Sequence, residues 1–311
     1  MQRTDIDSVA TALIDAYDGV RTLPPISATH AGFDAAAAYD VLHAIEARRH
    51  AQGWTRCGRK IGFTNRTLWA RYGVDRPMWA HVWTRTVHQA ASGDATLALA
   101  QFGQPRIEPE VVFGLAGPVP VEGDARRILD AVAWIAPGFE IVQSHFPDWK
   151  FTAADCTAAF GLHGALVVGP RTPLDDRRRD ALAAALPLFS ATLSQGERGV
   201  DRGVGANVLD SPALALRHLA QVLATQPQFP PLKAGEVVTT GTLTDAWPVT
   251  PGQTWSSDYG ELGLPPLRLT LAEGDRRFRP ARSRRGERRL PPQRRRSAGG
   301  RPAPVRRTDS R

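Results

Sequence analysis

The sequence predicts an α+β fold, in which helices and strands occupy separate stretches of the chain. Two helical patterns lie close together near the N-terminus, within residues 5–51. Much of the remainder consists of short apolar or β-branched runs separated by Gly and Pro turns, with a few helices in between. Because these runs do not alternate regularly with helices, a doubly wound parallel sheet is not expected.

The first predicted helix covers residues 5–17, and Gly19 is placed to end it. A second helix is predicted from Asp34, as its N-cap, to Ala51. Residues 23–27 contain two consecutive prolines, so we expect an extended linker between the two helices.

A lysine stands between two glycines in the next stretch, Gly-Arg-Lys-Ile-Gly-Phe-Thr-Asn at residues 58–65. The lysine is Lys60, and hydroxyl and amide side chains follow it. This pattern is typical of a loop whose backbone approaches a ligand closely. The alternative interpretation is an ordinary solvated lysine.

Two carboxylates two residues apart, Glu108 and Glu110, lie within the apolar run Pro-Arg-Ile-Glu-Pro-Glu-Val-Val-Phe at residues 105–113. In a strand, both would point to the same face, about 7 Å apart at their Cα atoms. Glu140 lies inside a second apolar run at residues 136–142. Three converging carboxylates predict a site for a hard divalent ion, Mg²⁺ or Mn²⁺. Glutamates at strand edges that face water or pair with arginines remain the alternative.

The remaining elements follow from local patterns. A helix is predicted from Asp124 through Ile135, a strand at residues 164–168, and a solvated charged turn at residues 175–180. The Gly-rich stretch 203–208 lacks the third glycine of a dinucleotide-binding loop and is discounted. The C-terminal part gives four further expectations. These are a strand at residues 189–193, a helix beginning at 210–212, a β-branched strand that runs into a Gly/Thr turn within 237–244, and a last strand at 267–271.

The positive charge of the chain is confined to its C-terminal end. The whole sequence holds 39 basic and 31 acidic residues, but residues 274–311 contain 15 arginines and only three acids. Residues 1–273 therefore hold 24 basic and 28 acidic residues and are mildly acidic. The Arg- and Pro-rich end has almost no apolar residues, so we expect it to be disordered.

The chain shows no secretory signal and no apolar run of the roughly 20 residues that a membrane span needs. Its two cysteines, Cys57 and Cys156, provide neither a disulfide framework nor a Cys-x-x-Cys metal site. We therefore expect a cytoplasmic protein with no membrane partner. The expected organisation is an N-terminal helical segment (1–80), a metal-binding domain (81–273) and the disordered tail (274–311).

Several motifs occur together in one order: Lys-Ile-Gly-Phe-Thr at 60–64, Glu-x-Glu at 108–110, Pro-x-x-Glu-Ile-Val at 137–142, Asp-Trp-Lys at 148–150 and Gly-Thr-Leu-Thr at 241–244. In this combination the sequence resembles the 2-keto-4-pentenoate hydratase / 4-oxalocrotonate decarboxylase family of the fumarylacetoacetase-like superfamily. The resemblance covers residues 5–272.

This resemblance implies a mixed β-roll or β-sandwich fold behind an N-terminal helical segment. It implies a divalent metal, Mg²⁺ or Mn²⁺, held by Glu108, Glu110 and Glu140, with Lys60 as the active-site lysine. The implied substrate is a 2-hydroxy-2,4-dienoate or its 2-oxo tautomer from aromatic-compound degradation. On the matching motifs we assign substrate binding to three side chains and expect a homo-oligomer; the three are Thr64, Lys150 and Thr242.

One segment departs from the family pattern. The family's usual Asp-Thr-Ile-Ala-Asp-Asn-Ala-Ser-Ser-Gly aligns with residues 155–164, where Asp155 is kept, Phe160 replaces asparagine, and Leu162 and His163 replace two serines. Asp155 is predicted to be catalytic. His163 is a candidate acid/base, with a packed structural histidine as the alternative.

The leading hypothesis is a divalent-metal-dependent hydratase, a lyase that adds water to a 2-oxo-alkenoate. Decarboxylation of a 2-oxo-enedioate on the same site is the nearest alternative, since both reactions stabilise the same kind of enolate. Hydrolysis of a carbon–carbon bond in an acylpyruvate is the third. Nucleic-acid binding through the Arg-rich tail is the non-enzymatic alternative, and the acidic body argues against it.

Overall fold

The computed structural model describes residues 1–274. The expected disordered tail lies outside the described residues apart from Gly274, and so does the non-enzymatic alternative that depends on it. The three-part division of the chain stays a prediction; β2 (Met78–Trp83) runs across its first boundary at residue 80.

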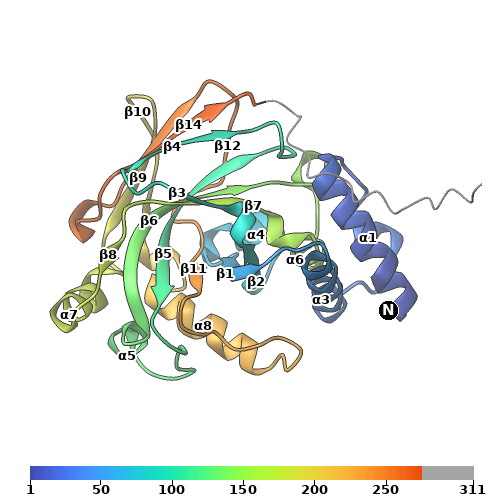
Figure 1. Ribbon diagram of the computed structural model, residues 1–311, viewed down its shortest axis with the longest axis horizontal. Helices are drawn as coiled ribbons and strands as arrows, with labels where there is room; N and C mark the ends of the chain where they lie inside the picture. The colour runs from blue at the N-terminus through green and yellow to red at the C-terminus, as the bar shows by residue number, and fades with distance from the viewer. Residues whose placement is uncertain (275–311) are drawn as a thin grey trace, which may run out of the picture. The chain divides into compact units, whose positions relative to one another are not determined.

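Two β-sheets form the centre of the fold (Figure 1). The larger has the order β2-β1-β11-β5-β6-β7-β3, with β12 beside β5 and β8 beside β6. The smaller has the order β10-β9-β13-β14-β4. The strands of the larger sheet are β1 (Arg56–Gly62), β2, β3 (Val87–Gln89), β5 (Arg106–Leu115), β6 (Val132–Val142), β7 (His163–Val168), β8 (Thr172–Pro173), β11 (Val237–Thr239) and β12 (Trp247–Pro248). Those of the smaller sheet are β4 (Asp94–Ala98), β9 (Ser190–Gln195), β10 (Arg198–Val204), β13 (Thr254–Asp258) and β14 (Leu267–Ala272).

Helices cover the large sheet at its edges and its lower side in Figure 1. The α-helices are α1 (Arg3–Gly19), α2 (Ile26–Thr29), α3 (Ala35–Ala51), α4 (Trp69–Tyr72), α5 (Ala125–Leu129), α6 (Ala153–Ala158), α7 (Asp176–Ala185) and α8 (Pro212–Ala224). Single 3₁₀ turns are η1 (Arg66–Leu68), η2 (Thr84–Thr86), η3 (Pro147–Trp149), η4 (Phe160–Leu162), η5 (Gly205–Asn207) and η6 (Gly260–Leu262). Within residues 1–274, none of these helices has the length and apolar character to cross a membrane. The expected α+β class is confirmed.

Both N-terminal helices form as predicted. The Asp34 carboxylate accepts a hydrogen bond from Ala37 N at 2.9 Å and so caps α3. The first helix runs through Gly19, and Val20 takes the left-handed end position with φ 50°. The two helices pack together with α6 around a shared apolar core.

Four local predictions were wrong in part. Residues 58–62 belong to strand β1 rather than to a loop, because β11 and β2 pair with it on both sides. Gly58 is needed there since a Cβ would lie 1.8 Å from the Val237 carbonyl oxygen. The extended linker ends at Pro25, because the Asp155 carboxylate binds Ser27 N at 2.8 Å and stabilises the first turn of α2.

The other two errors concern where helices begin and end. Asp124 caps a helix as expected, but α5 ends at Leu129. Val132 and Ile135 then pair with β5 as part of β6. Residues 175–180 begin helix α7 rather than form a turn, because Asp175 caps it and Leu182 is buried in the core.

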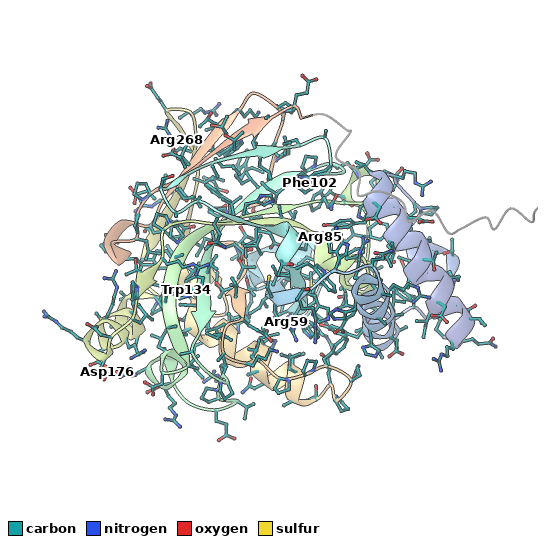
Figure 2. All side chains as sticks on the ribbon, in the orientation of Figure 1. Arg59, Arg85, Phe102, Trp134, Asp176 and Arg268 are labelled. Carbon is teal, nitrogen blue, oxygen red and sulfur yellow. The ribbon has the colours of Figure 1, made fainter. Side chains whose placement is uncertain are left out.

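The two sheets pack face to face around one apolar cluster. Trp255 and Leu269 of the small sheet and Phe139 of the large sheet are among its buried members. The same face of β5 and β6 continues into a larger core that these strands share with α5, α7 and α8. The opposite face carries a smaller buried cluster that includes Val112, Ala136 and Leu166. Figure 2 shows Arg59 of β1 inside the molecule and Asp176 of α7 at its rim. The large sheet is therefore buried on both faces, which explains its nearly continuous apolar strands.

Candidate metal centre and cavity

The register of strands β5 and β6 places the three predicted glutamates together. Glu108 lies directly opposite Glu140, and Glu110 follows two residues later on the same face of β5. One oxygen of each carboxylate lies within 4.8 Å of the others. Like charges directly opposite in a sheet are destabilising without a counter-charge, so this cluster requires a cation.

Lys60 of β1 is one such cation. Its Nζ lies 3.1 Å from Oε2 of Glu140 and donates to the Gly161 carbonyl oxygen at 3.0 Å. Strands β11 and β5 separate β1 from β6, so these strands are about 14 Å apart in a flat sheet. The contact therefore requires the large sheet to curl around the cluster.

Glu110 keeps one oxygen for a ligand. Its Oε2 accepts hydrogen bonds from Gly241 N at 2.7 Å and from the Thr239 hydroxyl. Its Oε1 is fully buried and has no hydrogen-bond partner within residues 1–274. A buried carboxylate oxygen without a partner is costly. A divalent ion held by the three oxygens would satisfy Glu110, so the residues present fit such an ion.

Burial and mutual repulsion shape the charges of this cluster. Burial raises the pKa of Glu108 to about 7, although Lys60 opposes the shift. Burial, together with the charges of Glu140 and Glu108, raises the pKa of Glu110 well above its usual range. Burial also acts on Glu140, but Lys60 and His163 outweigh it and hold the pKa of Glu140 below its usual value. Burial opposes the charge of Lys60, yet the three carboxylates raise its pKa.

These shifts predict that divalent-metal affinity falls as the pH drops below about 7. Glu108 and Glu110 must lose protons before they can bind a cation, so each competing proton lowers the affinity about 10-fold per pH unit below its pKa. The stability of the metal-free fold depends on pH with the opposite sign. There, the stabilising contribution of protonated Glu108 is complete below pH 4.5 and is lost as the pH rises through 7.

Calorimetry in two buffers of different ionisation enthalpy measures the protons that metal binding releases. Release of protons at pH 6 is the expected result. An affinity that stays constant between pH 5.5 and 8 would contradict the assignment of these two carboxylates as ligands.

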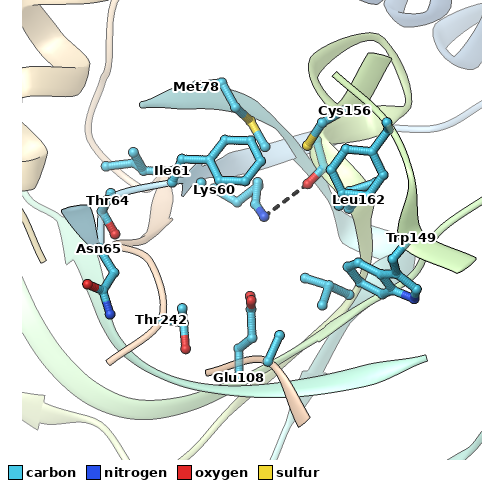
Figure 3. A pocket seen from close by; sticks show the side chains of 16 residues that line it. Lys60, Ile61, Thr64, Asn65, Met78, Glu108, Trp149, Cys156, Leu162 and Thr242 are labelled. Atoms are coloured by element: carbon cyan, nitrogen blue, oxygen red, sulfur yellow. Dashed lines mark hydrogen bonds between the residues drawn. The ribbon is translucent and has the colours of Figure 1, made fainter. Parts of the chain in front are cut away.

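A cavity opens beside the cluster, lined by Glu108 and Lys60, with an empty volume of about 570 Å³ that includes open solvent at its mouth. Figure 3 shows three polar side chains on one side of it, Thr64, Asn65 and Thr242, with Lys60 and Glu108 between this side and the other. The Thr64 hydroxyl is buried and finds no hydrogen-bond partner among the described residues.

Most of the remaining lining is apolar and forms one packed cluster, which we call the apolar wall. Four of its members are buried, namely Met78, Val142, Cys156 and Leu162. Four more are partly buried and pack against them, namely Phe63, Trp149, Phe151 and Ala246. The cavity therefore has a polar side and an apolar side.

The structure brings Lys60, Thr64, Thr242 and the three glutamates together, as the sequence predicted. Thr242 is already engaged, since its hydroxyl donates to the Thr244 carbonyl oxygen at 2.9 Å. Lys150 is exposed and does not line the cavity. Its neighbour Trp149 takes that place, because left-handed backbone at residues 148 and 149 directs the chain differently from an ordinary strand.

The Asp155 carboxylate lies outside the cavity lining and holds local structure. Besides Ser27 N, it accepts hydrogen bonds from the Ser27 hydroxyl at 2.6 Å and from both N and Oγ1 of Thr152. It thereby closes the capping box of α6 and fixes α2 beside it. This environment favours a structural role for Asp155 over the predicted catalytic one.

His163 lies behind the metal cluster, not in the cavity lining. Its Nδ1 is 2.7 Å from Oε1 of Glu140, and its Nε2 is 2.8 Å from the Thr86 hydroxyl. Both ring nitrogens therefore have partners. This geometry favours a role for His163 in positioning Glu140, rather than a role as an acid/base that contacts the substrate.

Replacing His163 by Ala is therefore expected to weaken divalent-metal binding about 10- to 100-fold, as removal of a partner behind a metal ligand does. A catalytic acid/base would instead lower kcat at saturating metal and leave metal affinity unchanged. Titration of the metal by calorimetry separates the two. His81→Ala is the matched control, because His81 is an equally buried histidine that contacts Glu46 at 3.1 Å outside the cavity.

Sequence reasoning missed the apolar wall and the partners of the glutamates. Phe63 and Trp149 lie inside two of the quoted motifs, so their positions were a usable signal. No sequence signal marked Thr239, which contacts Glu110, or Thr86, which contacts His163. Both contacts join residues that are far apart in the sequence.

The sequence and the fold are similar to those of known proteins. Residues 71–270 match the family model of the fumarylacetoacetate (FAA) hydrolase C-terminal domain. The chain is 30% identical to 2-hydroxyhexa-2,4-dienoate hydratase of Comamonas testosteroni, over 85% of this chain and 97% of that protein. It is 28% identical to a 4-oxalocrotonate decarboxylase of a Pseudomonas species, over 73% of this chain and 83% of that protein.

A solved structure shares the fold. It is 4-oxalocrotonate decarboxylase from Pseudomonas putida G7, complexed with magnesium and adipate, with a TM-score of 0.78 and 23% identity. The similarity covers 87% of this chain and 98% of that one. The chain therefore belongs to the fumarylacetoacetate hydrolase family, in the group that contains the 2-keto-4-pentenoate hydratases and 4-oxalocrotonate decarboxylases.

Proposed function

We propose that this protein is a divalent-metal-dependent hydratase that adds water to a 2-hydroxy-2,4-dienoate or its 2-oxo tautomer in the degradation of aromatic compounds. The observation that carries the proposal is the Glu108–Glu110–Glu140 cluster with Lys60 beside it at the base of a cavity. Hydratases among its relatives support it.

The three carboxylates would hold Mg²⁺ or Mn²⁺, since hard divalent ions prefer oxygen ligands. When bound, such an ion supplies Lewis-acid polarisation of the 2-oxo group of a substrate. Glu110 contributes its unpaired Oε1, and Glu140 is held in place by His163 and Lys60. The cofactor assignment to these two metals is part of the proposal.

The residues of the polar side would bind the head group of the substrate. Lys60 has three N–H donors, two of which meet Gly161 and Glu140, and the third can donate to the 2-oxygen of the substrate as enolate charge develops. The unsatisfied hydroxyl of Thr64 can donate to the substrate 1-carboxylate. Lys60 would also carry a proton between that oxygen and solvent.

Incubation with Mg²⁺ and a panel of 2-hydroxydienoates and 2-oxo-enedioates tests the proposal, with products identified by mass. Hydration adds about 18 mass units and decarboxylation removes about 44, as these reaction classes require. The expected result is water addition to a 2-hydroxydienoate that depends on the metal. Loss of carbon dioxide alone would identify a decarboxylase, and cleavage of an acylpyruvate into two acids would identify a carbon–carbon hydrolase.

A further inference from the structure

We propose that the cavity accepts a 2-oxo acid whose far end is apolar and uncharged, and that it rejects a second carboxylate at that end. The inference deepens the proposed function and rests on it, because the 2-oxo acid head group is assigned from that function. It concerns the side of the cavity opposite the polar side chains.

The apolar wall is distinct from the structural cores in its buried members, although Phe151 also packs against the core of the N-terminal helices. Its buried members form a cluster of their own, and every member of the wall lines the cavity. Phe63, Trp149, Phe151 and Ala246 stay partly exposed. Apolar surface gathered in this way is typical of a ligand site, because covering it with an apolar group removes it from water.

The two sides of the cavity fix the direction of a linear substrate. Figure 3 shows Thr64 and Thr242 on one side and Leu162 and Trp149 on the other. Lys60 lies between the two sides, where an oxygen at the second carbon would meet it. A head group bound by the polar side chains therefore sends the rest of the carbon chain toward the apolar wall.

A carboxylate at the wall would find no counter-charge. Among the described residues that line the cavity, Lys60 is the only basic side chain, and three glutamates already surround it. Lys150 is exposed and outside the lining. Arg106 lies with its guanidinium carbon 4.1 Å from the ring centroid of Trp149 and lines a neighbouring cavity instead. Burying an unpaired carboxylate is costly.

The wall is also preformed. Trp149 donates from Nε1 to the Gln104 carbonyl oxygen at 3.1 Å, and Arg106 stacks on its ring. Leu162 lies in a left-handed run, with φ of 58°, 58° and 60° at residues 160–162. These contacts and backbone angles hold two members of the wall in place before any ligand binds, so little ordering is needed to accept an apolar group.

Equilibrium binding of two six-carbon acids tests the inference. 2-Oxohexanoate ends in a methyl group and 2-oxoadipate in a carboxylate, and neither has a double bond to hydrate. With Mg²⁺ present, calorimetry is expected to show that 2-oxohexanoate binds about 30-fold more tightly or better, the scale of one unpaired buried polar group. Equal affinities, or binding of neither acid, would overturn the inference.

A charge placed at the wall provides a matched pair of variants. Ala246→Lys is expected to reduce the preference for 2-oxohexanoate over 2-oxoadipate about 10-fold, because the new ammonium group can pair with the second carboxylate. Ala246→Met introduces a side chain of similar length without charge and is expected to leave this preference unchanged. Narrowing by both variants alike would overturn the inference, because it would trace the preference to space and not to charge.

The two proposals can fail separately. If no 2-hydroxydienoate gains water while 2-oxohexanoate still binds more tightly than 2-oxoadipate, the hydratase assignment fails and the apolar wall retains its role. If water is added equally well to dienoates ending in methyl and in carboxylate, the hydratase assignment stands and the inference fails.

Discussion

Glu110→Gln is expected to abolish divalent-metal binding and turnover together. Oε2 of the Glu110 carboxylate already accepts hydrogen bonds from Gly241 N and the Thr239 hydroxyl. A glutamine can keep these contacts with its carbonyl oxygen, which turns its NH₂ group toward the position of Oε1. An amide donor that faces a cation repels it. The loss of metal binding is therefore expected from the exchange of one oxygen for an NH₂ group, without a change in the shape of the side chain.

Two measurements check this expectation beyond activity. Metal titration by calorimetry is expected to show an affinity at least about 100-fold lower than that of the wild type. The metal-free variant is expected to be more stable than the metal-free wild type at pH 8, by about 1 kcal/mol or more, because a buried charge among like charges has gone. Metal binding at wild-type affinity would remove Glu110 from the site.

Glu236→Gln is the matched control. Glu236 is another buried glutamate close to the same sheet, and it pairs with Arg59 at 3.0 Å outside the cavity. Its replacement is expected to lower stability and leave metal affinity unchanged. An equal loss of metal in both variants would point to general damage to the sheet.

Short-range patterns predicted the metal cluster because they depend on geometry within one strand. The period of two along a strand placed Glu108 and Glu110 on one face. The fold also follows from local signals where a cap decides the outcome, as Asp34 does for α3. The predictions failed where pairing with a distant strand decided it, as for β1 and for residues 132–135 of β6.

The rest of the site depends on tertiary structure that no local pattern encodes. The apolar wall combines side chains from β2, β6, α6, the 3₁₀ turns η3 and η4, and loops, which are remote from one another in sequence. His163 and Glu140 meet because β6 and β7 are neighbours, and the sequence left the role of that histidine open. Lys150 was assigned to the substrate from its motif, but the backbone at Trp149 decides which of the two side chains enters the cavity.

Lys60→Met is expected to lower kcat and kcat/KM together, by about 100-fold or more, the scale of one lost electrostatic donor. The ammonium group lies 3.1 Å from Glu140 and beside the cavity, so it faces the place where enolate charge would develop. Charge that appears only during reaction affects the transition state more than substrate binding. Metal affinity is expected to be unchanged or slightly higher, because a positive charge next to the three carboxylates has gone.

Lys60→Arg is expected to rescue little of this loss. The lysine fits closely, since its Cδ lies 3.2 Å from where a Cβ on Gly161 would stand, and a planar guanidinium needs more room and a different donor direction. Lys150→Met is the control, because this exposed lysine lies outside the cavity lining and its loss is expected to leave both constants unchanged. If Lys60→Met raised KM alone and kept kcat, Lys60 would bind the substrate carboxylate, and the role of stabilising the enolate would pass to another group.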